Sequence, residues 1–172
     1  MQYKLNEIAP TKIGLVLNRK KASLQSNIKR NYNVVSLKSF NDNGVYKHPT
    51  QEDIEEFVAD SVLKEDYIVT KGDILVRLRT PNFAVCIDED YQDLVVSSLM
   101  AIIRVKNEMI LPQYLTFYLN SDFVKKQLSI DATSAALWLE KQNILRELSN
   151  QSVNEFFKYF SGREIHLLLT QD

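Results

Sequence analysis

The sequence predicts an α+β fold: a twisted, mixed or antiparallel sheet of short strands with a few helices, followed by a helical C-terminal tail. Two observations lead to this prediction. Short apolar segments bounded by turn residues recur as far as residue 105. From Pro112 onward, apolar residues recur with the spacing of a helix. The length of 172 residues fits about one domain. We expect the sheet domain over residues 1–136 and the helical segment over residues 137–172.

The N-terminal region predicts short strands joined by turns. They are expected at Leu5–Ala9, at Ile13–Leu17, at Asn33–Leu37 and from Val45 onward. Pro10 and the turn residues Asn41–Gly44 separate strands, and Gly14 falls where the backbone can bend or bulge. Asn18–Asn33 is polar and basic without an apolar face, which is typical of a loop or a poorly ordered arm.

A short helix is predicted after Thr50. Thr50 and Asp53 have the spacing of a capping arrangement. The residues that follow can form one apolar helix face: Ile54, Phe57, Val58 and Val62. Because acidic groups near a helix start interact favourably with its dipole, such a helix would account for the acidic cluster found here.

The segment from Tyr67 to Val105 predicts strands joined by tight turns. Strands are expected at Tyr67–Val69, Ile74–Arg79, Phe83–Ile87, Leu94–Val96 and Leu99–Val105, with turns at Thr70–Asp73 and Thr80–Asn82. Pro112 then opens a helix, and its apolar face holds Tyr114, Leu115, Tyr118 and Leu119. A second amphipathic turn runs through Phe123, Val124 and Leu128.

The last forty residues predict two helices, at Leu137–Leu148 and Gln151–Gln171. The second carries an apolar stripe made of Phe156, Phe157, Phe160, Leu167 and Leu168. This stripe can pack against the chain's own core, or it can form a surface for a second copy or another protein.

The charge is distributed unevenly, although the net charge of the chain is −1. Residues 1–50 hold nine Lys or Arg against Glu7 and Asp42, whereas residues 51–66 hold seven acidic residues against Lys64. Such an asymmetry can hide a nucleic-acid surface in a nearly neutral protein, although a solvated basic face is the commoner explanation.

No catalytic motif is recognisable. The four glycines are too far apart for a phosphate-binding loop, and His48 and His166 lack the spacing of a zinc site. Asp73 with Arg77 and Arg79 is similar to part of a nuclease core, but the following strand lacks the second acidic residue and the lysine that a metal nuclease needs. We therefore predict that the protein is not an enzyme and that it holds no metal or cofactor.

The single cysteine, Cys86, stands among apolar residues, as a thiol in a strand core does. One cysteine excludes an internal disulfide, no apolar run approaches the roughly 18–20 residues of a membrane span, and the N-terminus lacks the pattern of a signal peptide. These features predict a cytoplasmic protein.

Several short segments, taken in order, resemble a known family. The segments are Lys4–Ala9, Ile13-Gly14, Val34–Leu37, Asn43–Tyr46, Val69–Leu75 (VTKGDIL), Phe83–Val85, Ser97–Val105 and Pro112–Ser121. Together they are similar to one target-recognition domain of a type I restriction-modification specificity subunit. The tail departs from that pattern, because Asp131–Thr133 replace a Gly-containing turn and no proline precedes Gln151.

The resemblance implies a role in DNA recognition. Specificity subunits of this family carry two recognition domains, each reading half of a split site, and their long helices dock methyltransferase subunits. The methyltransferase binds S-adenosylmethionine and methylates adenine. This chain holds one domain, so the resemblance implies a half-size version. Its partners would be double-stranded DNA, the methyltransferase (modification) subunit, the restriction subunit and a second copy paired through the C-terminal helices. The alternative is a truncated homologue that binds the methyltransferase and acts as a competitor.

Given the resemblance, side-chain chemistry selects candidate DNA contacts. Arg reads guanine and Asn reads adenine through paired hydrogen bonds, so the candidate base readers are Arg77, Arg79 and Asn82. The candidate phosphate contacts, which position a protein without reading sequence, are Arg19, Lys20, Lys21, Lys29 and Arg30. For both sets the alternative is a solvated surface.

Overall fold

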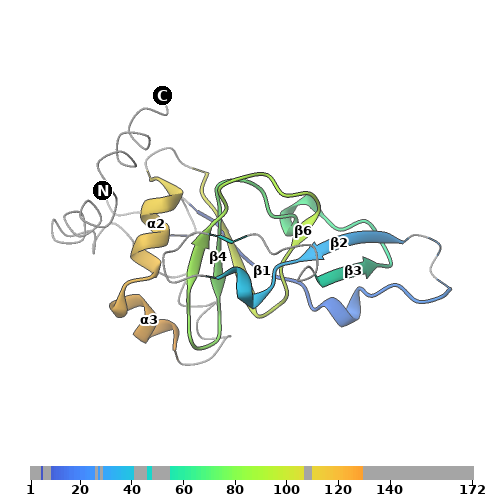
Figure 1. Cartoon of the computed structure of the whole chain (residues 1–172), viewed down its shortest axis with the longest axis horizontal. Helices are drawn as coiled ribbons and strands as arrows, with labels where there is room; N and C mark the ends of the chain where they lie inside the picture. Colours follow the sequence, from blue (N-terminus) through green and yellow to red (C-terminus); the bar gives the residue numbers. More distant parts are fainter. Residues whose placement is uncertain are drawn as a thin grey trace.

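The computed structural model describes residues 5, 9–25, 27, 29–40, 46–47, 55–106 and 110–129. These residues form two sheets and a pair of α-helices that follow one another along the long axis of the molecule (Figure 1). The predicted α+β fold class is confirmed. The turn at Asn41–Gly44, the cap at Thr50 and the helical segment 137–172 lie outside the described residues.

The larger sheet has the strand order β1-β7-β4-β5, and all its pairings are antiparallel. Its strands are β1 (Thr11–Ile13), β4 (Asp73–Arg77), β5 (Ala84–Cys86) and β7 (Met100–Arg104). The first four residues of β4 and of β7 are all buried. This double-sided burial explains why these strands appear in the sequence as nearly continuous apolar runs rather than as an alternation.

Two α-helices, α2 (Pro112–Leu119) and α3 (Asp122–Leu128), pack against one face of this sheet. Their buried side chains include Leu115, Tyr118, Leu119, Val124 and Leu128, which share a core with Ile74, Val76, Ala101 and Ile103. The opposite face carries a second core that includes Leu75, Val85, Ile102, Val69, Leu94 and Val96. The larger sheet is therefore the inner layer of the molecule.

Asn120, the residue at the C-terminal end of α2, covers the open edge of the larger sheet. Its side-chain Oδ1 accepts a hydrogen bond from the Ala84 amide (2.9 Å), and its Nδ2 donates to the Ala84 carbonyl oxygen (2.8 Å). A side-chain amide thus pairs with edge strand β5 as a neighbouring strand would. The same contact fixes α2 to the sheet.

The smaller sheet has the order β3-β2-β6, with β2 (Arg30–Val34) antiparallel to β3 (Glu55–Ala59) and parallel to β6 (Leu94–Val95). One face is buried, and its side chains are Tyr32, Val34, Phe57, Ala59 and Val95. The other face is exposed or half-buried, and it presents Asn31, Asn33, Glu56 and Val58.

Gly14 lies where the chain passes from the larger sheet toward the smaller one. Its amide donates to the Met100 carbonyl oxygen (3.0 Å), and the next amide, of Leu15, donates to Val96 (2.9 Å). A Cβ at position 14 would come within 2.6 Å of the Val96 carbonyl oxygen and closer still to that of Ser97. Only glycine fits between these backbones. In the described part of the chain, three short 3-10 helices form connections: η1 (Leu17–Arg19), η2 (Leu37–Ser39) and η4 (Glu65–Tyr67).

Several predictions about local structure are wrong. The strand expected at Ile13–Leu17 is not formed, because β1 ends at Ile13 and Leu17 begins η1. The strand expected at Tyr67–Val69 is not formed either, because Tyr67 belongs to η4. Leu5 is helical rather than extended, and the Ala9 amide donates to its carbonyl oxygen (2.7 Å). Residues 55–59 form β3 instead of a helix, because Phe57 and Ala59 pair with β2 and share its buried face. The expected loop Asn18–Asn33 is shorter than predicted, because β2 already begins at Arg30.

Candidate nucleic-acid interface

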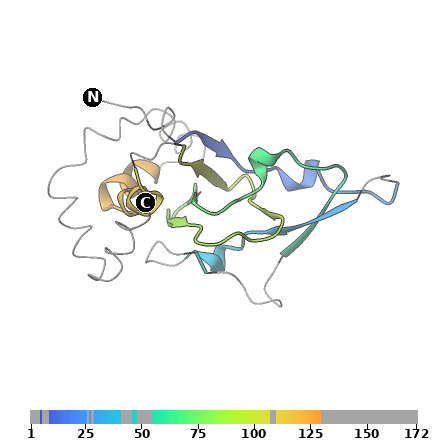
Figure 2. The same ribbon diagram turned by 90° about the horizontal axis from the view of Figure 1, so that it is seen from above.

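The connection between η1 and β2 forms the end of the molecule that lies farthest from α2 and α3 (Figures 1 and 2). Lys21 forms a bridge with Ala59 along the outer edge of β3. The Ala22 amide donates to Val58 (2.8 Å), and the Asp60 amide donates to Lys20 (2.9 Å). The segment after η1 thus continues the smaller sheet beyond β3.

On the other side of β3, Arg30 is the register partner of the same residue, Ala59. Lys21 and Arg30 therefore flank Ala59 from its two sides, one strand away in each direction. The fold in this way brings together two basic groups that are about ten residues apart in sequence. We call this group the basic tip, and it consists of Arg19, Lys20, Lys21, Lys29 and Arg30.

The side chains of the basic tip are all exposed. Arg30 pairs with Asp93, with 3.2 Å between Nη2 and Oδ1. Within the described part of the chain, the other four have no carboxylate oxygen within 4.0 Å. Positive charges without internal partners are available to an anionic ligand such as the phosphate backbone.

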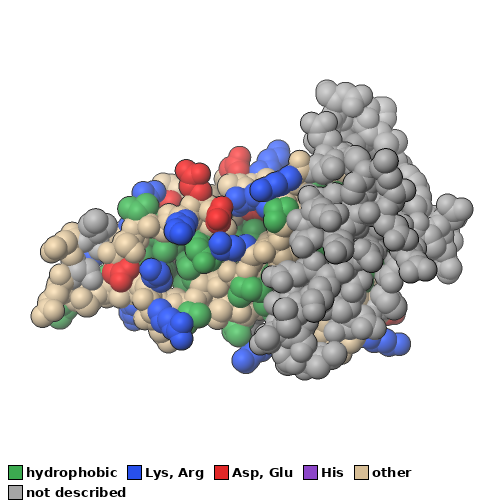
Figure 3. All heavy atoms as spheres, turned by 180° about the vertical axis from the view of Figure 1, so that it is seen from behind, with side chains coloured by type: hydrophobic (Ala, Val, Ile, Leu, Met, Phe, Trp, Pro, Cys, Tyr) green, Lys and Arg blue, Asp and Glu red, His purple; other side chains and the backbone are tan. Residues whose placement is uncertain are grey.

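An excess of positive charge characterises the described part of the chain as a whole. It holds sixteen Lys and Arg against eleven Asp and Glu. Figure 3 shows basic side chains distributed along the described part of one face, from the end formed by the smaller sheet toward the middle, with acidic side chains among them. The local charge is therefore more positive than the net charge of −1 indicates.

The candidate base readers lie elsewhere, at the end of β4. Arg79 is exposed and Arg77 is half-buried, with Leu78 buried between them. Arg77 Nη2 donates to the Thr80 carbonyl oxygen (3.4 Å). Asn82 is only 4% exposed, and its Nδ2 donates to the Arg77 carbonyl oxygen (3.1 Å), so in this conformation its amide stabilises the turn. The structure therefore presents Arg77 and Arg79 on the larger sheet, separately from the basic tip.

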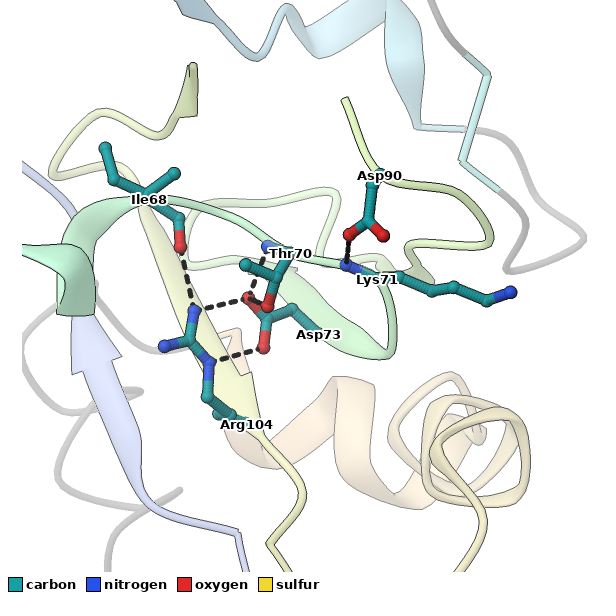
Figure 4. A network of polar contacts seen from close by, with 6 residues as sticks. All are labelled: Ile68, Thr70, Lys71, Asp73, Asp90 and Arg104. Atoms are coloured by element: carbon teal, nitrogen blue, oxygen red, sulfur yellow. Dashed lines mark hydrogen bonds and ion pairs between the residues drawn. The ribbon is translucent and has the colours of Figure 1, made fainter. Parts of the chain in front are cut away.

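Asp73, the acidic residue of the nuclease hypothesis, is 1% exposed and fully engaged (Figure 4). Arg104 Nε and Nη2 donate to its two carboxylate oxygens, each at 2.8 Å, and the Thr70 amide donates to Oδ2 (2.9 Å). These bonds raise the pKa of Arg104. Gly72, at φ 85°, completes the turn that closes the network.

Arg104 also links this turn to the rest of the fold, because its Nη2 donates to the Ile68 carbonyl oxygen (2.8 Å). Asp73 therefore holds a turn together. Within the described residues, no group of three or more His, Cys, Asp or Glu is placed to hold a metal ion.

Cys86 lies in β5 and is buried, as its sequence context predicts. Burial, with a smaller contribution from Asp88, raises the pKa of its thiol to about 12. The thiol is therefore protonated at neutral pH and unsuited to nucleophilic chemistry. His48, His166 and the stripe Phe156, Phe157, Phe160, Leu167 and Leu168 lie outside the described residues.

A solved structure with a similar fold is the HsdS subunit from Thermoanaerobacter tengcongensis. The TM-score is 0.51 and the sequence identity is 14%, and the match covers 82% of this chain and 36% of the HsdS chain. This chain thus spans about a third of the subunit that it resembles, and the likeness concerns the fold. No protein family matches the sequence, and a search of curated proteins finds no significant match.

Neither described α-helix has the length and apolarity that a membrane crossing requires.

Proposed function

We propose that this chain is a DNA-recognition module that directs a partner adenine methyltransferase to its site. The basic tip is the observation that carries the proposal: five exposed cations at one end of the molecule, four of which have no carboxylate partner in the described chain. The fold shared with an HsdS subunit supports it.

The strands at the tip could approach the DNA major groove. That groove is about 12 Å wide and admits β-strands, and β2 and β3 of the three-stranded smaller sheet lie beside the basic residues. Arg19, Lys20, Lys21 and Lys29 would then contact phosphates and set the register. Arg77 and Arg79 would provide a second group of contacts at the end of β4.

In this proposal the chain recognises the DNA site, and the methyltransferase catalyses the methylation. The methyltransferase holds S-adenosylmethionine, and a restriction subunit can join the same assembly. Pairing of two copies through the stripe Phe156, Phe157, Phe160, Leu167 and Leu168 would bring two recognition domains together. That pairing stays a prediction.

The test is co-purification of the full chain with the methyltransferase subunit encoded nearest to its gene, followed by an adenine-methylation assay on genomic DNA. We expect methylation of a defined motif that requires this chain. If about six charges of the chain contact phosphates, affinity for DNA should fall roughly 10³-fold or more between 50 and 200 mM salt. A complex that methylates with no dependence on this chain would refute the proposal.

A second candidate is a competitor that occupies the methyltransferase without reading DNA. The likeness to HsdS concerns the fold, and a chain with this fold could bind a methyltransferase without useful affinity for DNA. A stable complex with the methyltransferase that suppresses methylation when this chain is in excess would support this alternative.

A further inference from the structure

We propose that Arg30 reads a guanine base and that Asp93 positions it for this task. The inference rests on the proposed function, and it assigns a base-reading role inside the basic tip. Phosphate contact would require only the charge of Arg30, whereas the surroundings of this side chain fix its direction.

Asp93 is held firmly beside β2. The Asn33 amide donates to the Asp93 carbonyl oxygen (2.9 Å), and Asn33 Nδ2 donates to the Gln92 carbonyl oxygen (3.1 Å). Asp93 has φ 49°, and it is the one non-glycine residue with positive φ in the described chain. Aspartate tolerates this conformation at some energetic cost, so the surrounding structure must maintain it. The backbone of Asp93 is therefore held in place beside β2, and its carboxylate is the acceptor that Arg30 contacts.

Arg30 contacts two anchors at once. Its Nη2 donates to Asp93 Oδ1 (3.2 Å), and its Cζ lies 5.8 Å from the centre of the Tyr32 ring. Tyr32 is itself immobilised, because it is 2% exposed and its hydroxyl accepts a hydrogen bond from the Leu63 amide (3.0 Å). The guanidinium is thus oriented by a carboxylate and by an aromatic ring that the core holds in place.

The oriented guanidinium still has free donors. The Arg30 side chain is 49% exposed and that of Asp93 is 28% exposed, so a ligand can reach the pair. A guanidinium has five N–H donors, and the bond to Asp93 uses one of them. Two parallel donors are what O6 and N7 of guanine accept in the major groove.

The other residues of the basic tip lack this arrangement. Within the described chain, Arg19, Lys20, Lys21 and Lys29 have no hydrogen-bonded carboxylate or ring contact that would set their direction. A freely rotating cation suits a phosphate, whereas base reading benefits from a side chain whose rotamer is already fixed. Arg30 is therefore distinguished from its neighbours by preorganisation.

The experiment selects duplex DNA with a randomised core on the full chain, in complex with its methyltransferase subunit, and compares wild type with four variants. Arg30→Lys keeps the charge and removes the paired donors, and Arg30→Ala removes both. Asp93→Asn keeps the shape and tolerates the backbone conformation. Lys21→Ala is the matched control, because Lys21 flanks the same residue of β3.

We expect Arg30→Lys and Arg30→Ala to lose one guanine preference of the selected motif by about tenfold or more. Asp93→Asn should weaken the same preference without changing the salt dependence of binding. Lys21→Ala should leave the motif unchanged and lower the magnitude of the salt slope by about 0.9. All four substitutions are at solvent-accessible side chains, and unchanged thermal unfolding verifies that each variant is folded.

Two results overturn the inference alone: a motif that Arg30→Lys leaves intact, or an Asp93→Asn variant that binds all sequences more tightly because Asp93 merely neutralises the tip. A wild-type complex that selects no sequence overturns the proposed function and the inference with it.

Discussion

The two sheets differ in how they use their charged groups. In the larger sheet, Asp73 and Arg104 form a two-point ion pair at 2.8 Å, and the carboxylate is almost fully buried. In the smaller sheet, Arg30 and Asp93 meet at 3.2 Å near the surface, and the neighbouring cations have no carboxylate partner in the described chain. The first arrangement satisfies its charges internally, and the second leaves most of them available to a ligand. Under the proposed function, the comparison predicts that the ion pair of the larger sheet contributes to stability and that the cations of the smaller sheet contact the ligand.

Thiol reactivity should show the largest difference between the regions. Cys86 in β5 is buried, and its pKa is raised to about 12, so at pH 8 it should react with a disulfide reagent on the order of 10³ times more slowly than a free thiol. A Leu24→Cys change in a Cys86→Ala background provides the reference, because Leu24 is 98% exposed and lies in the connection between η1 and β2. Equal rates at the two positions would contradict this picture of the larger sheet.

Substitutions at acidic residues should then separate buried from exposed ion pairs. Asp73→Ala leaves Arg104 and the Thr70 amide without their acceptor, and we expect a loss of about 2–4 kcal/mol in the free energy of unfolding. Asp66→Ala is the control, since the Lys12–Asp66 pair is exposed and spans 3.6 Å, and it should change stability by less than about 0.5 kcal/mol. Urea denaturation measures the free energy of unfolding of both variants. A similar loss for the two would show that the buried Asp73 network contributes no more to stability than the exposed pair does.

Removal of the Asn120 side chain should have a smaller effect. Asn120→Ala uncovers the Ala84 amide and carbonyl of edge strand β5, and we expect a loss of about 1–3 kcal/mol. Lys126→Ala on the exposed surface of α3 provides the baseline. If Asn120→Ala and Lys126→Ala have the same free energy of unfolding in thermal and urea experiments, hydrogen bonds to water compensate for the two that are lost.

The smallest stability effects are expected at the basic tip. Lys20→Ala and Lys21→Ala should each change the free energy of unfolding by less than about 0.5 kcal/mol, because neither side chain has an internal carboxylate partner in the described chain. Each should nevertheless reduce the slope of log affinity against log salt concentration by about 0.9. DNA binding measured across a salt series tests this, and an unchanged slope would place these residues outside the interface.

The sequence predicts the larger sheet better than the smaller one, for a physical reason. The buried strands β4 and β7 contain the apolar runs Ile74–Val76 and Met100–Ile103, and Gly72 in the sequence indicates the turn before β4. The helix from Pro112 is likewise confirmed. In these segments local pattern and tertiary burial require the same residues.

The smaller sheet was harder to predict because β2 and β3 are half polar. In β2, Tyr32 and Val34 are buried, whereas Asn31 and Asn33 lie on the other face. The sequence contains this alternation of apolar and polar residues, but the basic residues before it indicated a loop. In β3 the acidic residues suggested a helix start, whereas pairing with β2 determines the structure. The proximity of Lys21 and Arg30 depends on that pairing, so it could not be predicted from spacing alone.

The chain from Leu94 to Arg104 places β6 in one sheet and β7 in the other, with four residues between them. This short connection couples the two sheets, so we expect them to unfold together. The molecule should melt in one transition, and DNA that binds at the basic tip should raise the melting temperature of the larger sheet as well. Through this shared segment, the stability of the larger sheet and the occupancy of the tip become thermodynamically linked.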